Sequence, residues 1–408
     1  APLTLSSALE QSLENNYGLK ISRADLQVAE INNNWGTAGR YPTIGFDASD
    51  NNSYDLNSSA YTNRLSAGVG LNWILFDGFR VNLTKSQLES LEDLSSGRLA
   101  IQVESTIEDI VLAYYGVLLQ MEQLKVLETV MRLSDDRYQY ELKKKSLGGS
   151  VTFNVLQAQN VFLTDKANFM NQEMLVRNSI RNLNFMMGVE PSLIWEFTEA
   201  FQADTSNFVL GDLLDKMKSD NQSLKNQYTN LLLQENQTAL QKSNYYPSLS
   251  LGAGMDYGHT WSYSGGEQTF NNESITPYGN VRLSFDIYSA GVRKRGVEIA
   301  RINEEIAKVE IDQMEHALTN EFFNLFDFHE VRLELLNVAN ENLEAAELNL
   351  SISEEKYRSG VINSFNYRDI QLIYLNVSYQ RLQAVYNLIG SKTALTRITG
   401  GFLAYAAE

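Results

Sequence analysis

Cysteine is absent from the 408 residues, which excludes disulfides, thiolate catalysis, cysteine-based metal sites and lipid modification of an N-terminal cysteine. Basic residues are also scarce, because 33 lysines and arginines stand against 50 acidic residues and give a net charge of −17. Nucleic acid and anionic lipid both require a concentrated basic surface. The composition therefore predicts no nucleic-acid partner.

Long hydrophobic runs are missing too, since no stretch approaches the roughly 18 consecutive apolar residues of a membrane helix. If the chain crosses a bilayer, it must do so with β-strands. The sequence starts at Ala1 without a basic, apolar leader, as expected of a mature exported chain. With 43% hydrophobic residues and only 5 prolines, it has enough apolar side chains for a packed core.

The chain contains two copies of one design. Tyr41-Pro42 recurs as Tyr246-Pro247 at an offset of 205, whereas Gly148 recurs as Gly360 at an offset of 212. The difference, 212 − 205 = 7, predicts a seven-residue insertion at an exposed loop of the second copy. We therefore expect two structural repeats that form one intertwined domain, each with a helix, a β-hairpin, a long helix and a further helix, at residues 1–204 and 205–408.

Four segments alternate between apolar and polar residues with the period of two that is typical of β-strands. The predicted hairpins span residues 41–77 and 246–289, with the polar segments 51–63 and 258–276 as exposed loops. One interpretation is an amphipathic sheet on a soluble core. The other is membrane strands, because apolar-out runs of about ten residues match a tilted membrane strand. In that case the lipid-facing side chains are Ile44, Phe46, Val69, Leu71, Trp73, Leu251, Leu283 and Phe285.

The rest of each copy has helical periodicity. Apolar residues from Val103 to Leu124 follow alternating spacings of four and three, which predicts helix-on-helix packing with coiled-coil geometry. The helix over residues 79–146 is expected to be about 100 Å long at about 1.5 Å per residue. Two shorter helical stretches, 5–39 and 152–188, match it in combined length. Each copy is therefore predicted to form one continuous helical rod and one broken rod. A ring of such two-rod units would form a helical tube.

This order of elements, with Tyr-Pro entering each first strand and Phe76-Asp77-Gly78 leaving the second, resembles the TolC-type outer-membrane efflux proteins over essentially the whole chain. The second copy departs from the exit motif, where it reads Tyr288-Ser289-Ala290-Gly291. The resemblance implies an α+β membrane protein of TolC-like fold. In such a fold, each protomer contributes four strands to a trimeric transmembrane barrel that a long α-helical barrel continues.

Four strands from one chain cannot close a barrel, and open sheet edges are not tolerated in hydrocarbon. Several protomers must therefore share one barrel, and the family's solution is a homotrimer. The resemblance further implies a Gram-negative outer membrane with a large periplasmic portion, and contacts with outer-membrane lipid. It implies a periplasmic adaptor protein and, through it, an inner-membrane pump. The expected function is passive export of small molecules, ions or polypeptides.

The resemblance also implies that two turns form the tip that contacts the adaptor. These are Leu147, Gly148 and Gly149 in the first copy, and Ser359, Gly360 and Val361 in the second. Lys143, Lys144 and Lys145 precede the first turn. They are explained either by the dipole of a helix C-terminus or by direct contact with the adaptor.

A periplasmic constriction is the second site that the resemblance implies, formed by Tyr357, Asp369, Asn366 and Asn154. The two asparagines stand where relatives often carry aspartate, and Ile362 replaces an arginine of some relatives. Asp369 is therefore the main charged candidate. The alternative is that these polar residues cap helices. We expect Tyr357 and Asp369 to face each other across the last helix pair.

No catalytic motif is evident, and the three histidines have no spacing that predicts a metal site. His329 lies on a heptad position, where we expect a structural role with its hydrogen bonds satisfied. The sequence thus predicts no enzyme activity, cofactor or metal. The competing functions are a soluble coiled-coil scaffold and an outer-membrane barrel enzyme.

Overall fold

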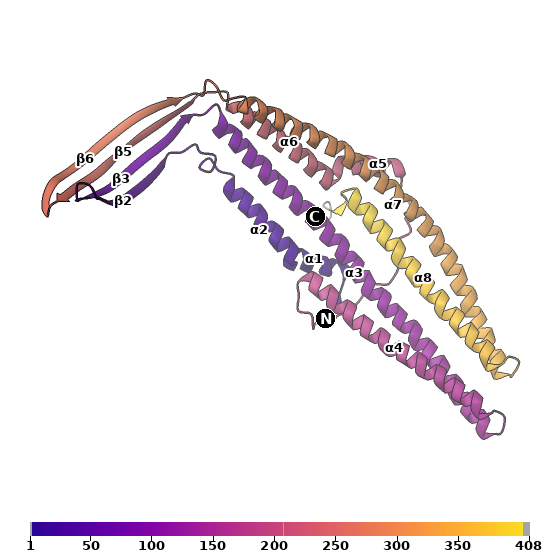
Figure 1. Ribbon diagram of the computed structural model, residues 1–408. Helices are drawn as coiled ribbons and strands as arrows, with labels where there is room; N and C mark the ends of the chain where they lie inside the picture. The colour runs from indigo at the N-terminus through magenta and orange to yellow at the C-terminus, as the bar shows by residue number, and fades with distance from the viewer. Residues whose placement is uncertain (1, 207, 403–408) are drawn as a thin grey trace. The chain divides into compact units, whose positions relative to one another are not determined.

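The computed structural model describes residues 2–206 and 208–402 (Figure 1). Each half has the same order of two shorter helices, a hairpin, a 67-residue helix and a helix of 35 or 36 residues. The elements are β1 (Pro2–Leu3), α1 (Leu5–Asn15), α2 (Tyr17–Asn32), β2 (Thr43–Asp55), β3 (Ala60–Phe76), α3 (Arg80–Ser146), α4 (Thr152–Met187), β4 (Glu196–Phe197), α5 (Leu210–Asp220), α6 (Gln222–Ser243), β5 (Ser248–Ser264), β6 (Glu267–Ser284), α7 (Val292–Arg358) and α8 (Ser364–Ile398).

The chain divides into two compact units, and each draws segments from both halves of the sequence. The helical unit comprises Ala1–Ala24, Gly97–Lys225 and Gln313–Glu408. The sheet unit comprises Asp25–Ser96 and Asn226–Asp312.

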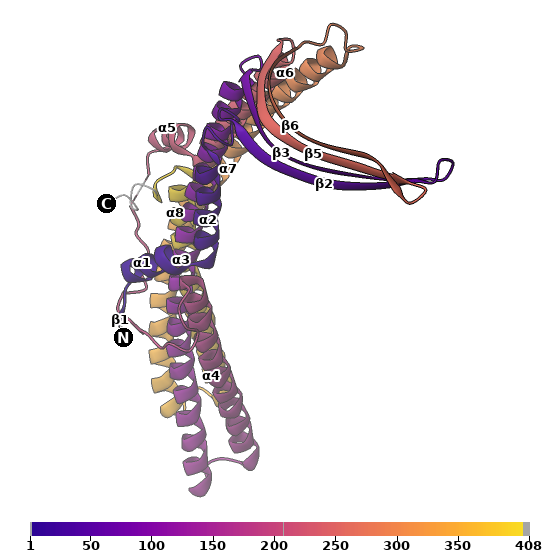
Figure 2. The same ribbon diagram turned by 90° about the vertical axis from the view of Figure 1, so that its left-hand side faces the viewer.

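The sheet unit contains one antiparallel sheet with the strand order β2-β3-β5-β6 (Figure 2). Both predicted hairpins are confirmed, but the expected loops at 51–63 and 258–276 are wrong. The strands continue through most of these segments, leaving turns only at 56–59 and at Gly265-Gly266. The polar residues of these segments form cross-strand pairs within the sheet and do not form loops. The Thr62 and Ser262 hydroxyls, for example, lie 2.8 Å apart.

The seven extra residues of the second copy do not lengthen the hairpin turn. The strands β5 and β6 together have five residues more than β2 and β3, and the connection from β6 to α7 has four more than that from β3 to α3, while the turn has two fewer. Gly265 and Gly266 have φ angles of 65° and 92°, which a two-residue hairpin turn of the primed type requires. The insertion therefore extends both the sheet and the connection that leaves it.

The core of the helical unit confirms the predicted heptad seam. Ile107, Ile110, Tyr114 and Val117 are all buried on α3 and pack with the C-terminal half of α8. Each fully buried aliphatic side chain of this kind contributes about 1.5–3 kcal/mol. α3 is also long and apolar enough to cross a membrane by composition, with 33% of its most apolar stretch buried.

The prediction of helix over 5–39 is wrong at both an internal and a terminal position. The chain breaks at Asn16 and α2 ends at Asn32. Asn16 Nδ2 donates to the Met186 carbonyl at 2.8 Å, while its Oδ1 accepts a backbone N–H of α2 at 3.2 Å. Asn221, 205 residues later, donates in the same way to the Ile398 carbonyl at 2.9 Å. A side-chain hydrogen bond thus replaces the helical one at both breaks.

Two glycines complete this repeated joint. A Cβ atom added to Gly188 would lie 2.4 Å from the Asn15 carbonyl oxygen, and one added to Gly400 would lie 2.5 Å from that of Asp220. Both glycines have positive φ and end their helices. Close backbone approach therefore explains why glycine recurs at these positions.

His329 departs from the expected role. Its imidazole is buried, and Nδ1 lies 3.1 Å from the Ser391 hydroxyl, which itself donates to the Leu388 carbonyl. Nδ1 is therefore the donor, and Nε2 has no hydrogen-bond partner among the described residues. Burial lowers the pKa of His329, which favours this neutral form.

Candidate functional site

The ends of the two helical hairpins are glycine-terminated turns. Gly148 and Gly360 have φ angles of 80° and 78°. At each turn the following N–H donates at 2.8 Å to a carbonyl five residues back, from Gly149 to Lys144 and from Val361 to Lys356. These are Schellman motifs, which need glycine because of the positive φ.

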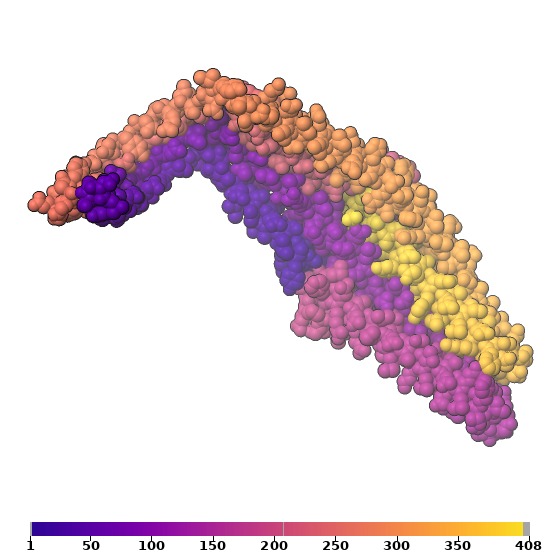
Figure 3. Space-filling view, in the orientation of Figure 1, coloured from indigo at the N-terminus to yellow at the C-terminus, as the bar shows by residue number. Residues whose placement is uncertain are grey.

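Apolar side chains project from both turns. Leu147 is 79% exposed and Val361 is 71% exposed. Figure 3 shows both hairpin ends, in magenta and in orange to yellow, open to solvent. Exposed apolar residues beside a rigid turn suit a contact with another protein. No atom lies within 4 Å of a Cβ added at Gly148 or Gly360. A larger residue at either position would therefore destabilise the turn by straining its backbone, and not by a clash with neighbouring atoms.

The predicted constriction residues do not form one group. Tyr357 is buried, donates its hydroxyl to Glu141 Oε1 at 2.9 Å and stacks on Tyr367 at 4.9 Å. Asp369 and Asn366 are exposed, and no hydrogen bond among the described residues joins Tyr357 to Asp369. The carboxylate that Tyr357 contacts within the chain is Glu141 of α3, and the expectation that Tyr357 and Asp369 face each other stays a prediction.

The alternative role as helix caps is wrong for Asn154 and Asn366. α8 is capped by Asn363, whose side chain accepts from the N–H groups of Phe365 and Asn366. Asn154 Nδ2 donates only to Ser150 Oγ, at 3.4 Å. With no capping role and partial or full exposure, both asparagines stay available for the predicted constriction.

A buried ion pair joins α4 to α8, and the sequence did not reveal it. Arg368 donates to both Asp165 oxygens at 2.7 and 2.8 Å, and the two side chains are only 16% and 2% exposed. Planar bidentate geometry makes this the strongest kind of side-chain contact. No local signal reveals it, because Asp165 stands among polar neighbours such as Thr164 and Lys166.

The sheet has one apolar and one polar face. Ile44 lies opposite Leu71, and Phe46 lies opposite Val69. Residues directly opposite each other point to the same side, which places seven of the eight predicted lipid-facing residues on one face. The eighth, Phe285, lies just beyond the end of β6. None of the eight is buried, and they are Ile44, Phe46, Val69, Leu71, Trp73, Leu251, Leu283 and Phe285. The described chain therefore provides no core that covers this face.

Glycine dominates part of the opposite face. Gly45, Gly70 and Gly254 form one row with Tyr278. A Cβ at Gly254 would lie 2.7 Å from the Tyr278 hydroxyl, and one at Gly70 would lie 3.0 Å from it. The Tyr278 ring therefore lies flat across the two neighbouring strands, in space that side chains at Gly254 and Gly70 would otherwise fill.

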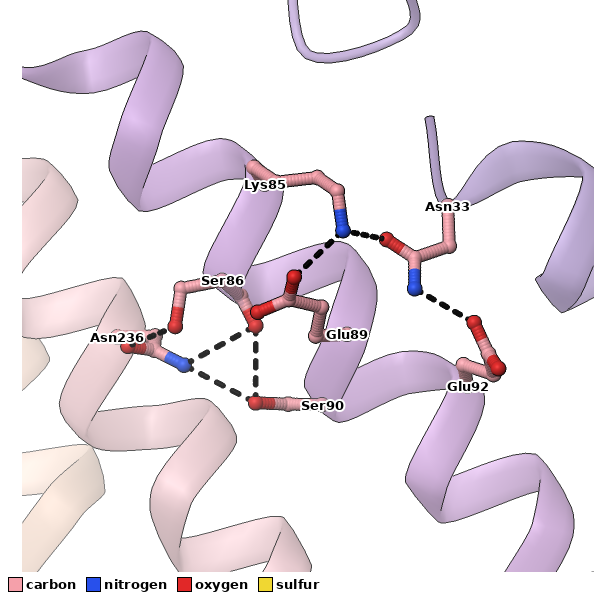
Figure 4. Close-up of polar contacts among 7 residues, drawn as sticks. All are labelled: Asn33, Lys85, Ser86, Glu89, Ser90, Glu92 and Asn236. Atoms are coloured by element: carbon pink, nitrogen blue, oxygen red, sulfur yellow. Dashed lines mark hydrogen bonds and ion pairs between the residues drawn. The ribbon is translucent and has the colours of Figure 1, made fainter. Parts of the chain in front are cut away.

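Polar contacts hold α3 between α2 and α6 in the sheet unit (Figure 4). Lys85 Nζ donates to Asn33 Oδ1 at 2.6 Å, and Asn33 Nδ2 donates to Glu92 Oε2 at 2.5 Å. On the other side, Asn236 Nδ2 donates to the Ser90 hydroxyl at 3.0 Å. Since hydrogen bonds depend on position more strongly than apolar contacts do, this cluster fixes the register of the three helices.

A second buried carboxyl lies in the helical unit. Glu104 is 5% exposed, and its Oε1 has no hydrogen-bond partner. Burial raises its pKa to about 7, although the charges of Arg397 and Lys225 partly oppose the rise. Burial also raises the pKa of Glu108, whose carboxylate pairs with Arg397 at 2.7 Å. These groups make the unit sensitive to pH.

Comparison with known proteins supports the fold. A family model described as "Outer membrane efflux protein" matches residues 8–189 and 213–401. The cation efflux system protein CusC of Escherichia coli O157:H7 is 22% identical over 325 residues, which are 76% of this chain and 66% of CusC. The chain therefore matches just under two thirds of the length of this curated relative.

Solved structures share the fold at low sequence identity. A crystal structure of CusC superposes with a TM-score of 0.80 at 16% identity, covering 97% of this chain and 92% of that one. The Campylobacter jejuni outer membrane channel CmeC gives 0.77 at 15% identity, covering 97% and 85%. The open state of the Neisseria gonorrhoeae channel MtrE gives 0.75 at 15%, covering 98% and 89%.

These matches confirm the predicted TolC-like α+β fold and the outer-membrane location. The chain belongs to the outer membrane efflux protein family.

Proposed function

We propose that the chain is one protomer of a passive exit duct in the outer membrane of a Gram-negative bacterium, serving a tripartite efflux or type I secretion system. The observation that carries this proposal is the sheet with one uncovered apolar face and one polar face. Lipid suits the first face and an aqueous lumen the second. No catalytic step is assigned to the chain.

The sheet edges require several copies, and the family resemblance makes that number three. β2 and β6 are the outer strands, and neither has a second partner strand within the described chain. Unpaired edges are costly in hydrocarbon, hence copies must pair β2 of one protomer with β6 of the next. Three copies supply 3 × 4 = 12 strands. Exposed apolar residues on the outer helices support such packing, namely Leu163, Met170 and Met174 on α4 and Phe328, Val331, Leu335 and Val338 on α7.

We assign the two exposed turns to contact with a periplasmic adaptor protein, which would link the duct to an inner-membrane pump. The turn residues are Leu147, Gly148, Gly149, Ser359, Gly360 and Val361. Candidate cargoes are small molecules, ions and polypeptides. One relative is named a cation efflux protein, which keeps ions among these candidates.

Planar-bilayer conductance of the purified protein, with its subunit count measured in detergent, tests this proposal. A conducting trimer is expected. A soluble coiled-coil scaffold would stay in solution without detergent and show no conductance, which would overturn the duct. Hydrolytic activity without conductance would favour the barrel enzyme instead.

Spin labels on the sheet should report lipid at one face only. We expect lipid contact at Val69 and Leu71 and water contact at Gly70 and Asn72, because alternate residues of a strand point to opposite faces. Oxygen and nickel accessibility of each label measures this. The reversed pattern would invert the proposed orientation of the sheet.

Combining Tyr357→Phe with Asp369→Asn should raise leak conductance and lower cation selectivity. The first change removes the bond from Tyr357 to Glu141, which joins α7 to α3. The second removes an exposed carboxylate that threefold symmetry would repeat as an acidic ring, and such a ring favours cations.

The two single variants separate these effects, since Tyr357→Phe should change conductance and Asp369→Asn the selectivity. Tyr138→Phe is the matched control, because the Tyr138 ring stacks on Phe162 at 6.3 Å within the α3–α4 hairpin. Unchanged conductance and selectivity in an assembled double variant would place the constriction elsewhere.

A further inference from the structure

Arg137 is a buried cation that forms no ion pair with a carboxylate among the described residues. Its side chain, on α3, is 3% exposed, and Nη1 donates to the Ser364 carbonyl at 3.2 Å. Nε is buried and has no hydrogen-bond partner among these residues. Burial and the neighbouring Arg368 guanidinium lower the pKa of Arg137, while Tyr357, Asp165 and Glu141 oppose this fall. A buried N–H donor that lacks an acceptor is costly, which indicates that an acceptor from outside the protomer completes this site.

The nearby carboxylates are already engaged. Asp165 accepts both of its hydrogen bonds from Arg368. Glu141 accepts from the Tyr357 hydroxyl at 2.9 Å and from the Ser150 hydroxyl at 2.5 Å. Both carboxylates offset part of the Arg137 charge, but neither forms a hydrogen bond with it among the described residues, so its buried Nε stays without an acceptor.

A cavity of about 360 Å³ opens beside Arg137 between the two helical hairpins. Three tyrosines form much of its wall, including Tyr140 and Tyr357. Two acidic side chains also line it, of which Glu354 pairs with Arg358 at 2.6 Å and Asp136 is exposed. The volume lies at the small end of ligand pockets and suits a single inserted side chain. The complete lining is Leu133, Asp136, Arg137, Tyr140, Glu354, Tyr357, Arg358 and Tyr367.

A basic surface leads from this cavity to the end of the α3–α4 hairpin. Lys143, Lys144 and Lys145 form the last turn of α3. Lys143 and Lys145 are exposed and have no ion pair among the described residues, while Lys144 Nζ lies 6.0 Å from the Tyr140 ring centre. Arg137, Tyr140 and Lys144 are spaced three and four residues apart, which puts them on one side of α3.

This positive surface stands against the net charge of −17 of the whole chain. The equivalent turn of α7 does not share it, because Glu354 and Glu355 balance Lys356 and Arg358 there. A helix dipole alone would favour cations at both helix ends. The difference between the two turns therefore needs another explanation.

We propose that the cavity at Arg137 is a docking pocket for an acidic side chain of a partner protein, which the lysines of the α3–α4 turn attract. The inference rests on the proposed function, since it names the chemistry of the adaptor surface that meets this tip. A second copy of the chain is a poorer occupant. In a symmetric ring it would bring the same lysines to the same level, where like charges repel.

The test uses the purified protein in detergent and a fluorescein-labelled peptide of six glutamates, with six-glutamine and six-lysine peptides for comparison. Fluorescence anisotropy should show that only the glutamate peptide binds, and that salt weakens its binding steeply. Lys143→Gln combined with Lys145→Gln, and Arg137→Gln alone, should each raise Kd by about tenfold, the scale of a lost charge-assisted bond. Lys166→Gln, at an exposed lysine on α4, should leave Kd unchanged.

Equal binding of the glutamate and glutamine peptides would overturn the proposal, as would wild-type affinity in the paired lysine variant, whose exposed positions tolerate change. Wild-type affinity in Arg137→Gln would show that the cavity at Arg137 is not part of the binding site. Arg137→Lys should retain part of the binding. Displacement of the peptide by phosphatidylglycerol vesicles would assign the surface to lipid instead. Conductance and subunit count of the same preparations keep the two proposals apart, because a conducting trimer that ignores the peptide retains the duct and rejects the docking site.

Discussion

Replacing Arg368 with methionine is expected to lower the free energy of unfolding of the helical unit by about 3–5 kcal/mol. The change leaves Asp165, which is 2% exposed, without the guanidinium that satisfies both of its oxygens. An uncompensated buried carboxylate is among the most destabilising consequences of a single substitution. The shift of the thermal midpoint of the purified protein, followed by circular dichroism, measures the loss.

The double variant Asp165→Leu with Arg368→Met provides the control. Replacing both partners by apolar residues removes the buried charges together, and stability should return to within about 1 kcal/mol of the original protein. The exposed pair of Lys308 and Glu304 is the matched surface comparison, where Lys308→Met should cost less than about 1 kcal/mol. Equal losses in the single and double variants would show that packing, and not the unpaired charge, determines the effect.

Replacing Glu104 with glutamine should remove much of the loss of stability that we expect between pH 4.5 and 7. Burial raises the pKa of Glu104 from 4.5 in the unfolded chain to about 7 in the fold. The folded state therefore binds the proton more tightly, and its stabilising effect is complete below pH 4.5 and lost as the pH rises through 7. The difference of 2.5 pKa units corresponds to about 3 kcal/mol.

Thermal midpoints measured from pH 4 to 8 test this, with Glu347→Gln at an exposed position of α7 as the control. A shallower slope should remain in Glu104→Gln, because burial also raises the pKa of Glu108 and Asp109. A slope that is identical in Glu104→Gln and in the original protein would mean that the Glu104 carboxyl is solvated.

Periodicity was a reliable guide to the elements, and composition was a poor guide to some of their ends. The apolar spacing from Val103 to Leu124 identified α3, because that stretch packs in the core, and the predicted bounds of this helix are right to within a residue. The hairpin loops were misplaced, since polar composition suggested loops where Thr62, Ser262 and their neighbours pair across strands. Polar residues end a strand only when they do not find partners on the next one.

The turns were predictable from the sequence and the contacts between hairpins were not. Glycine at position 148 or 360 reports a local backbone requirement, namely positive φ. The pair of Asp165 and Arg368 joins residues 203 positions apart, and no local pattern encodes which side chains will meet. The same holds for Tyr357, whose partner Glu141 lies 216 positions away. Lumen and lipid assignments stay predictions, because they depend on copies of the chain.

The short strand connections have a consequence outside transport. The four strands run almost to their ends, so that the turns between them comprise only residues 56–59 and Gly265-Gly266. In the proposed duct each protomer presents these turns, and the polar ends of strands that are longer than the roughly 9–11 residues that span a bilayer, to the surroundings of the cell. Antibodies and bacteriophages recognise outer-membrane proteins mainly through long surface loops. This protein therefore offers them a very small target, and its barrel should be hard to recognise on an intact cell.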